Sequence, residues 1–371
     1  MPASSTLTKR TPSGKWIVEK GTLTNDQVGL NDLCTITSYE NYELELEYRL
    51  PRRVPGSKRG DNGLFLRGQV EIQLVDSHCI EETTEMEAGA ITGRHPPLAN
   101  VQFPPGNWNH LRVKHIGHRV TVWHNGVLIQ DNVYLEEASQ GALKIHPKTK
   151  VELTKTNGPL MVQGDGKIWL KNIQVRTLFN EKHGWKSLWN GKDFLGLGCE
   201  GASRPEDYWK VENNGLTNQG NLGELGRDIL TREDFGNFLL HYEYRVNPAE
   251  GNGTSGVYLR NQWEIEISPS QTTVDIERDR DGAFRLIKTP DKPARNGETQ
   301  WNHVDAKLIR NRAWAWQNGV LIHDAVTLDR ATDSALTEIK PFSKAPLKFQ
   351  GSQGEVAFTN IFVRPLPDSR Q

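Results

Sequence analysis

Apolar and polar residues alternate along much of the chain. The segment at residues 42–50 reads YELELEYRL, in which leucine or tyrosine occupies every second position between charged residues. A period of two indicates a β-strand with one dry face and one wet face. The segments at 111–116 and 119–129 alternate in the same way, and Asn125 and Gly126 lie between two apolar runs. Asn-Gly in that position is the strongest short signal of a hairpin, so the pattern predicts short antiparallel strands.

The whole strand pattern occurs twice. The segment WNHLRVKHIGHRVTVWHNGVLIQDNV begins at Trp108, and its match WNHVDAKLIRNRAWAWQNGVLIHDAV begins at Trp301. Further matched pairs keep the same order, among them GDNGLFLRGQVEIQLV from Gly60 and GTSGVYLRNQWEIEIS from Gly253. Such self-similarity marks a duplication. We therefore predict an all-β fold of two tandem antiparallel β-sandwich domains, at residues 1–178 and 183–371.

One segment has no match. The second copy opens with GWKSLWNGKDFLGL from Gly184, and the first copy shows no counterpart to this opening. We expect the segment to supply a first strand that the first copy lacks or obtains in another way.

Composition and charge narrow the choice of partner. Lys and Arg number 45 against 46 Asp and Glu, for a formal net charge of −1. This balance argues against a nucleic-acid binder, which would carry a basic excess, and favours a neutral, polar partner. No apolar stretch approaches the ~20 residues of a membrane span, and the N-terminus shows no signal-peptide pattern. Cys34, Cys79 and Cys199 form no metal or redox motif, and we interpret them as buried free thiols.

One strand in each copy carries candidate chemistry. In VEIQLVD, Glu71 and Gln73 are two residues apart and therefore project from one face, while Asp76 joins that face only through a bulge. The set resembles the E-x-D-x-x-E arrangement of laminarinase-like glycosidases, in which two carboxylates flank the scissile bond. A solvated strand face is the alternative. The second copy has Glu264 and Glu266 on the matching face.

Arginines and aromatic residues near these strands are candidates for binding. Arg67 and Arg260 follow Gly-rich turns, where each either forks to sugar oxygens or pairs with a neighbouring glutamate. Trp123 and His124 precede the hairpin turn and offer ring faces to a sugar, with packing in the core as the alternative.

Two histidines are candidates for acid–base chemistry. His78 closely follows Asp76, and His95 lies in the loop AGAITGRHPPLAN. Each is a candidate base or ligand, and an inert surface histidine is the alternative. No HExxH or similar metal-binding spacing accompanies them.

The ordered set of motifs is similar to the 3-keto-disaccharide hydrolase family. The matching features are WKSLWNGKDFLGL, NYELELEYRL, DNGLFLR, VEIQLVDS, AGAITGRHPP, PGNWNHLRV with VTVWHNGVLIQD, and KIWLKNIQV. The second copy departs at the site, with EISPS in place of QLVDS and DGAFRLI in place of AGAITGR. Pro269 there takes the place of Asp76.

The resemblance implies a concanavalin A-like jelly roll that cleaves 3-keto-glycosides by C2 deprotonation, elimination and hydration. The catalytic residues would then be Glu71, Asp76 and His95, and the residues that bind substrate would be Arg67, Gln73, Trp123, His124, Arg260, Glu264 and Glu266. A divalent cation is considered at Glu71, Asp76 and His78, and no other cofactor is expected. Family habit favours the periplasm or the extracellular space, although the missing signal peptide leaves the cytoplasm open.

Two other functions stay open from the residues alone. The first is a lectin-like carbohydrate-binding tandem without chemistry. The second is a structural tandem in which the second copy completes a cleft or forms a homo-oligomer.

Overall fold

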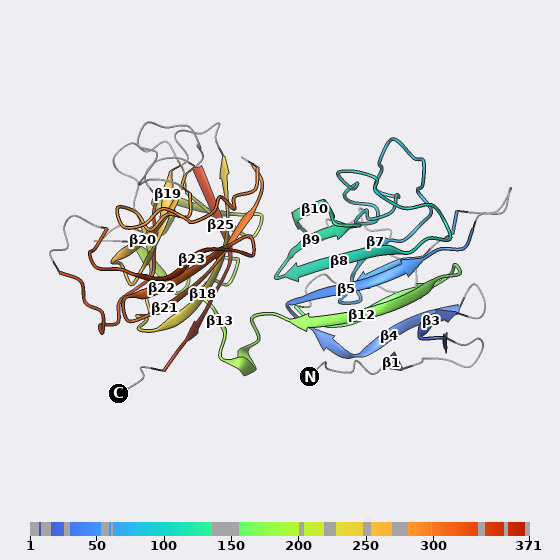
Figure 1. The fold of residues 1–371 in the computed structure, drawn as a ribbon, viewed down its shortest axis with the longest axis horizontal. Coiled ribbons are helices and arrows are strands. Elements are labelled where there is room, and N and C mark those ends of the chain that lie inside the picture. Colours follow the sequence, from blue (N-terminus) through green and yellow to red (C-terminus); the bar gives the residue numbers. More distant parts are fainter. Residues whose placement is uncertain are drawn as a thin grey trace. The chain divides into compact units, whose positions relative to one another are not determined.

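The computed structural model describes residues 7–8, 16–25, 30–52, 59–60, 62–135, 156–199, 204–218, 228–247, 254–268, 281–297, 299–332, 338–351 and 355–367. The chain forms two compact units, Met1–Leu178 and Phe179–Gln371. Each unit contains two antiparallel sheets (Figure 1), which confirms the predicted tandem β-sandwich. The helical elements among the described residues are two 3-10 turns, η1 (Glu181–His183) and η2 (Pro205–Asp207).

The first unit has a five-stranded small sheet and a seven-stranded large sheet. In spatial order the small sheet consists of β1 (Leu7–Thr8), β4 (Leu30–Tyr39), β11 (Gly158–Gly164), β6 (Gly63–Leu66) and β7 (Val70–Gln73). The large sheet consists of β10 (Val127–Tyr134), β9 (Arg119–His124), β8 (Asn109–Ile116), β5 (Tyr42–Arg49), β12 (Trp169–Thr177), β3 (Thr22–Asn25) and β2 (Trp16–Glu19).

The second unit repeats this plan. Its small sheet consists of β14 (Leu197–Cys199), β17 (Ile229–Thr231), β24 (Lys348–Phe349), β19 (Ser255–Leu259) and β20 (Trp263–Ile267). Its large sheet consists of β15 (Trp209–Glu212), β16 (Gly215–Asn218), β25 (Glu355–Pro365), β18 (Phe238–Asn247), β21 (Asn302–Ile309), β22 (Arg312–Gln317) and β23 (Val320–Thr327), with β13 (Lys186–Ser187) paired to β25.

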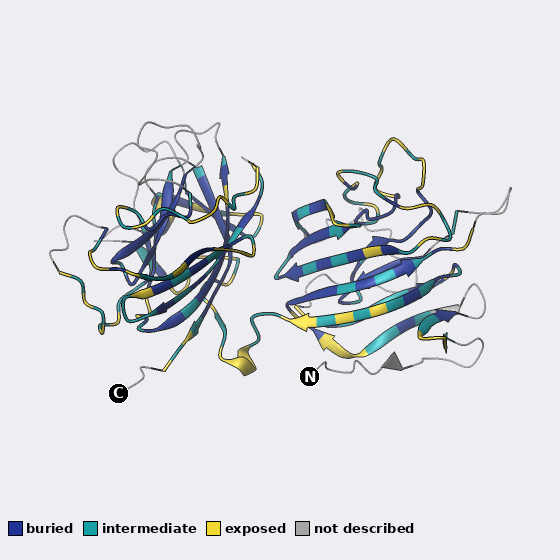
Figure 2. Cartoon of the chain, viewed as in Figure 1, coloured by how far each residue is buried: buried dark blue, intermediate teal, exposed yellow. Residues whose placement is uncertain are grey.

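The period-two pattern explains the core of each unit. On β5, Leu44, Leu46 and Tyr48 are buried in the first core, and the glutamates between them face away from it. Figure 2 shows more exposed residues recurring along β8 and β12 of the same sheet. The predicted hairpin is confirmed at Asn125 and Gly126, which have φ of 49° and 82°. Two consecutive positive φ values are what a tight type I′ turn requires.

The structure also bears on the predictions about the cysteines and about membrane-spanning segments. Cys34 and Cys199 are only partly buried, and Cys79 is exposed in an irregular turn beyond β7, so the interpretation as buried thiols is wrong. Within the described ranges, no helix is long and apolar enough to cross a membrane.

Candidate active site

The predicted glutamate lies on the outer face of the small sheet in the first unit. Val70 and Ile72 of β7 enter the core, so Glu71 projects from the opposite face. The Glu71 side chain is partly exposed and lies across β6 at Gly63. A Cβ atom on Gly63 would stand 2.0 Å from Glu71 Oε1, so the missing side chain makes room for the carboxylate.

A loop covers the free edge of β7. Thr92 N donates to Glu71 O at 3.0 Å, and Thr92 Oγ1 donates to Gln73 Oε1 at 3.0 Å. From β10, Gln130 Nε2 donates to His95 O at 3.3 Å. The loop therefore joins the edge strands of the two sheets. It places Thr92 beside Gln73 on the outer face, with His95 three residues further along.

Asp76 lies on the inner side of the sandwich. Leu74 N donates to Asn62 O at 2.8 Å in the β6–β7 register, whereas Asp76 N donates to Arg59 O at 3.1 Å, one residue further than regular pairing. Leu74 is in the core, and Asp76, two residues further on, is also buried and keeps the same side. Burial and the Asp76 charge both raise the pKa of the core phenol Tyr48. The E-x-D-x-x-E expectation is therefore wrong for this strand.

A buried polar network holds the segment that carries Asp76. Gln102 Nε2 donates to Tyr48 Oη at 3.0 Å, and Ser77 N donates to Gln102 Oε1 at 2.6 Å. Ser77 Oγ donates to Glu87 at 2.7 Å. His124 Nε2 lies 3.1 Å from Tyr48 Oη, and burial lowers the pKa of His124 to about 4. His124 is thus a neutral histidine between the sheets, away from any surface where a sugar would bind.

The described residues do not fit the cation considered at Glu71, Asp76 and His78. Glu71 and Asp76 lie on opposite sides of the strand. His78 is exposed, its N donates to Asp76 Oδ1 at 3.1 Å, and its ring Nδ1 is 3.4 Å from Gln102 O. No group of three His, Cys, Asp or Glu side chains in the described part of the chain is placed to hold a metal ion.

Both predicted arginines bind main-chain carbonyls. Arg67 Nη1 donates to Gly117 O at 2.7 Å, and its Nε donates to Glu40 O at 2.9 Å. Arg260 Nη1 donates to Pro341 O at 2.7 Å and to Ser343 O at 3.0 Å. Both side chains are buried. Each guanidinium therefore ties a turn to distant loops, an arrangement that neither of the two sequence alternatives included.

Trp123 lies on the outward face of the large sheet, not in the core. The Arg112 guanidinium lies 4.5 Å from its ring centroid, and Arg112 also pairs with Glu43 on the neighbouring strand. The Trp123 ring is partly exposed. Because it belongs to the other sheet, it does not face the same way as Glu71.

In the second unit the matching face carries an ion network. Gly256 again makes room for a glutamate, since a Cβ there would stand 2.2 Å from Glu264 Oε1. Glu264 and Glu266 are buried, and Arg285 reaches them at 3.4 Å and 3.6 Å. Burial raises the pKa of Glu264, although Tyr258 and Arg285 act in the opposite direction.

The network extends to the next strand. Lys348 Nζ pairs with Asp228 Oδ2 at 3.0 Å and lies 4.0 Å from the ring centroid of Tyr258. Sequence reasoning missed Arg285, Lys348 and Tyr258. The repeat offset holds the signal for them, because they take the positions of Thr92, Met161 and Phe65. Pro269 lies outside the described residues.

Comparison with protein families finds the same domain in both halves of the chain. The profile of the 3-keto-alpha-glucoside-1,2-lyase-like domain matches residues 5–176 and again residues 184–364. A search of curated proteins finds no significant match.

Among solved structures, a protein provisionally named a glycosyl hydrolase from Parabacteroides distasonis ATCC 8503 is 18% identical with a TM-score of 0.43, over 50% of this chain and 96% of that one. The carbohydrate-binding module CBM66 from Bacillus subtilis is 14% identical with a TM-score of 0.30, over 48% and 99%. A xylan beta-1,4-xylosidase from Bacillus halodurans C-125 is 10% identical with a TM-score of 0.34, over 93% and 84%. TM-scores below 0.5 support no conclusion about activity.

Proposed function

The chain belongs to the 3-keto-alpha-glucoside-1,2-lyase-like domain family and carries that domain twice, and from this premise we propose that its first unit cleaves 3-keto-glycosides with Glu71 as the base. Family membership makes the chain a carbohydrate-active protein. One observation carries the choice of residue. Glu71 is a partly exposed carboxylate, held across Gly63 on the outer face of the small sheet.

The proposed reaction is an elimination followed by hydration. The C3 ketone acidifies the C2 hydrogen, and Glu71 removes that proton. The electron pair forms the C1=C2 double bond as the C1–O bond breaks, and the departing oxygen gains a proton and leaves as an alcohol. Water then adds across the double bond, with no net oxidation or reduction.

Neighbouring groups have supporting roles in this proposal. Gln73 lies two residues along the same face, about 6–7 Å from Glu71 at the usual rise of a strand. Its side chain is buried and accepts a hydrogen bond from Thr92, so Gln73 holds the loop beside Glu71 and does not contact the sugar. His95, on the loop beside β7, is the proposed donor to the departing oxygen. No step passes through Asp76, His78 or a cation, because the structure separates Asp76 from Glu71.

The test compares two substrates that differ only at C3. The chain should release the aglycone from a 3-keto-glycoside and leave the unoxidised glycoside intact, because only the ketone acidifies C2. Parallel reactions with EDTA should proceed at the same rate. Cleavage of both substrates would contradict the elimination, and no cleavage with intact glycan binding would favour a lectin-like module.

A further inference from the structure

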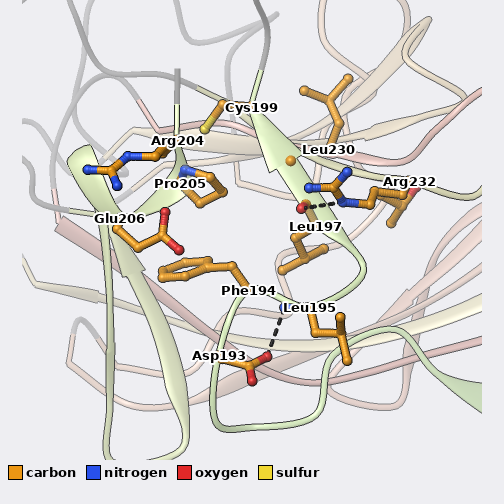
Figure 3. Close-up of a pocket in the computed structure, with 12 residues that line it drawn as sticks. Asp193, Phe194, Leu195, Leu197, Cys199, Arg204, Pro205, Glu206, Leu230 and Arg232 are labelled. Carbon is orange, nitrogen blue, oxygen red and sulfur yellow. Dashed lines mark hydrogen bonds between the residues drawn. The ribbon is translucent and has the colours of Figure 1, made fainter. Parts of the chain in front are cut away.

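A cavity lies in the second unit, and part of its lining comes from the opening segment that has no match in the first copy. Its volume is about 750 Å³, within the range of small-molecule sites. Figure 3 shows Phe194 at the centre of the view, with Glu206 and Arg204 on one side and Arg232 on the other. The described residues that line it are Asp193, Phe194, Leu195, Leu197, Gly198, Cys199, Arg204, Pro205, Glu206, Leu230, Thr231 and Arg232.

One wall is a turn fixed by its own hydrogen bonds. Asn190 Oδ1 accepts from Lys192 N at 2.9 Å, and Asp193 Oδ1 accepts from Leu195 N at 2.8 Å. The indole of Trp189 donates to Asp193 O at 2.6 Å. These bonds use the Asp193 carboxylate within the turn and set the positions of Phe194 and Leu195 before any ligand arrives.

The floor is a strand pair with a gap in its side chains. Gly198 of β14 pairs with Leu230 of β17. A Cβ on Gly198 would have no atom within 4 Å, so the space above this residue is open. The Phe194 ring and Leu230 give the cavity apolar surface, which suits the C–H face of a pyranose.

Two groups of opposite charge border this apolar surface. Arg232 Nε donates to Leu197 O at 3.0 Å, which fixes the direction of the guanidinium. Its terminal nitrogens have no hydrogen-bond partner among the residues that the structure describes. Glu206 is exposed and has no ion pair there, whereas Arg204 pairs with Asp207 at 3.2 Å. Arg232 can therefore donate hydrogen bonds to a ligand in the cavity, and Glu206 can accept hydrogen bonds from it.

We propose that this pocket is a non-catalytic site for a neutral pyranose. The sugar lies on Phe194, accepts hydrogen bonds from Arg232 and donates to Glu206. A sugar acid is repelled by Glu206, and an amino sugar by Arg232. A smaller cavity of about 290 Å³ shares Leu195, Thr231 and Arg232 with this one and offers room for a second sugar ring. The proposal does not depend on cleavage in the first unit.

The chain contains its own reporter of occupancy. Cys199 lines the pocket and is partly buried, whereas Cys79 is exposed in the other unit. Iodoacetamide labelling of the full chain is followed by mass spectrometry with and without maltose. At ten times the dissociation constant, maltose should slow labelling of Cys199 about tenfold and leave Cys79 unchanged. Glucuronic acid should protect neither.

Variants assign the protection to the pocket. Gly198→Leu fills the open space and should abolish protection of Cys199. Glu206→Gln should admit glucuronic acid, because it removes the repelling charge from an exposed position. Glu71→Gln should leave protection intact, which separates this site from the proposed cleavage.

Three outcomes overturn the proposal: no protection at saturating maltose, equal protection of both thiols, or protection that persists in Gly198→Leu. If Cys199 does not react even without sugar, saturation transfer from protein to maltose in the wild type and Gly198→Leu decides instead. Equal transfer to both proteins then contradicts the site.

Discussion

The outer face of the small sheet carries different chemistry in the two units. In the first unit the residues at the matched positions are Phe65, Glu71, Gln73, Thr92 and Met161. In the second unit they are Tyr258, Glu264, Glu266, Arg285 and Lys348. The duplication has kept one glutamate and the glycine beside it, and has changed nearly everything around them.

The charges of the five residues in the second unit, together with Asp228, nearly cancel. Glu264, Glu266 and Asp228 face the two cations Arg285 and Lys348, which leaves one excess negative charge if all are ionised. Protonation of Glu264 removes that excess, in agreement with its raised pKa. Buried charges need such pairing, since an unpaired one costs several kcal/mol.

This difference indicates which of the two faces can bind a substrate. In the second unit the two glutamates of this face are buried and paired with Arg285. In the first unit the same face has a partly exposed carboxylate beside uncharged side chains. We therefore assign the chemistry to the first unit and a supporting network to the second. Each prediction below challenges that division.

The largest expected effect is on turnover. Glu71→Gln should lower kcat on a 3-keto-glycoside by about 10²–10⁴-fold, the usual contribution of a general base. The matched variant Glu264→Gln should change kcat little, because the proposed chemistry uses no group of the second unit. The reverse result would move the active site to the second unit.

Removal of one of the two cations of the buried network should have the second largest effect, a loss of stability. Arg285→Met leaves Glu264 and Glu266 without it and should cost about 1–3 kcal/mol in the free energy of unfolding. The value is below that for a fully buried pair because the Arg285 side chain is 37% exposed. Urea unfolding measures the change. Arg330→Met, in an exposed pair with Asp329, is the control and should lie within about 1 kcal/mol of wild type. Equal losses would contradict a special role for Arg285.

The glycines beside the two glutamates should separate function from stability. In Gly63→Ala the new methyl group displaces the Glu71 carboxylate, and kcat should fall about tenfold or more, since small misplacements of a reacting group are costly. Gly256→Ala displaces Glu264 and should lower the melting temperature with unchanged kcat. Unchanged kcat in Gly63→Ala would count against Glu71.

The two units should also respond to pH in different directions. Burial lowers the pKa of His115 and His124, so the first fold holds them neutral. The unfolded chain binds those protons below about pH 6.5, and the first unit therefore loses stability as pH falls. His323 in the second unit is also lowered to about 4, which offsets His124 in the comparison.

Three other buried groups of the second unit act in the opposite sense. Burial raises the pKa of Glu264 and Asp281, so the second fold binds extra protons, and its stability falls as pH rises through those values. For His241, burial alone would lower the pKa, but Asp305 and Glu243 together outweigh burial and raise the pKa. Its contribution is present below the ordinary histidine pKa and is lost as pH rises.

Hydrogen exchange from about pH 7 to about pH 5.5 should therefore show loss of protection in residues 109–124 but not in residues 302–317. Rates are corrected for the intrinsic effect of pH on exchange. Parallel loss in both units would contradict the predicted difference in sign.

Much of the fold was predictable from the sequence. The alternation in YELELEYRL fixed which residues enter the core, and Asn-Gly fixed the hairpin turns, because both are local rules. The same alternation correctly placed Glu71 opposite Ile72. The unmatched opening also contains a strand, β13 (Lys186–Ser187), which pairs with β25.

The details of the site were not predictable, because they depend on segments far apart in sequence. Arg67 binds carbonyls at Glu40 and Gly117, which a local pattern does not reveal. Asp76 is buried and its charge acts on Tyr48 of the other sheet, a proximity that a local pattern does not reveal. Lys348 meets Tyr258 only through sheet pairing, although the repeat offset marks both positions.

A 3-keto-glycoside carrying deuterium at C2 provides the most direct test of Glu71 as the base that removes that atom. The wild type and Glu264→Gln should cleave it more slowly than the protiated substrate and to the same degree, while Glu71→Gln should cleave the C2–D bond at least about 10²-fold more slowly than the wild type. Equal rates for the two isotopologues in the wild type, or C2 cleavage that survives Glu71→Gln but not Glu264→Gln, would contradict the account.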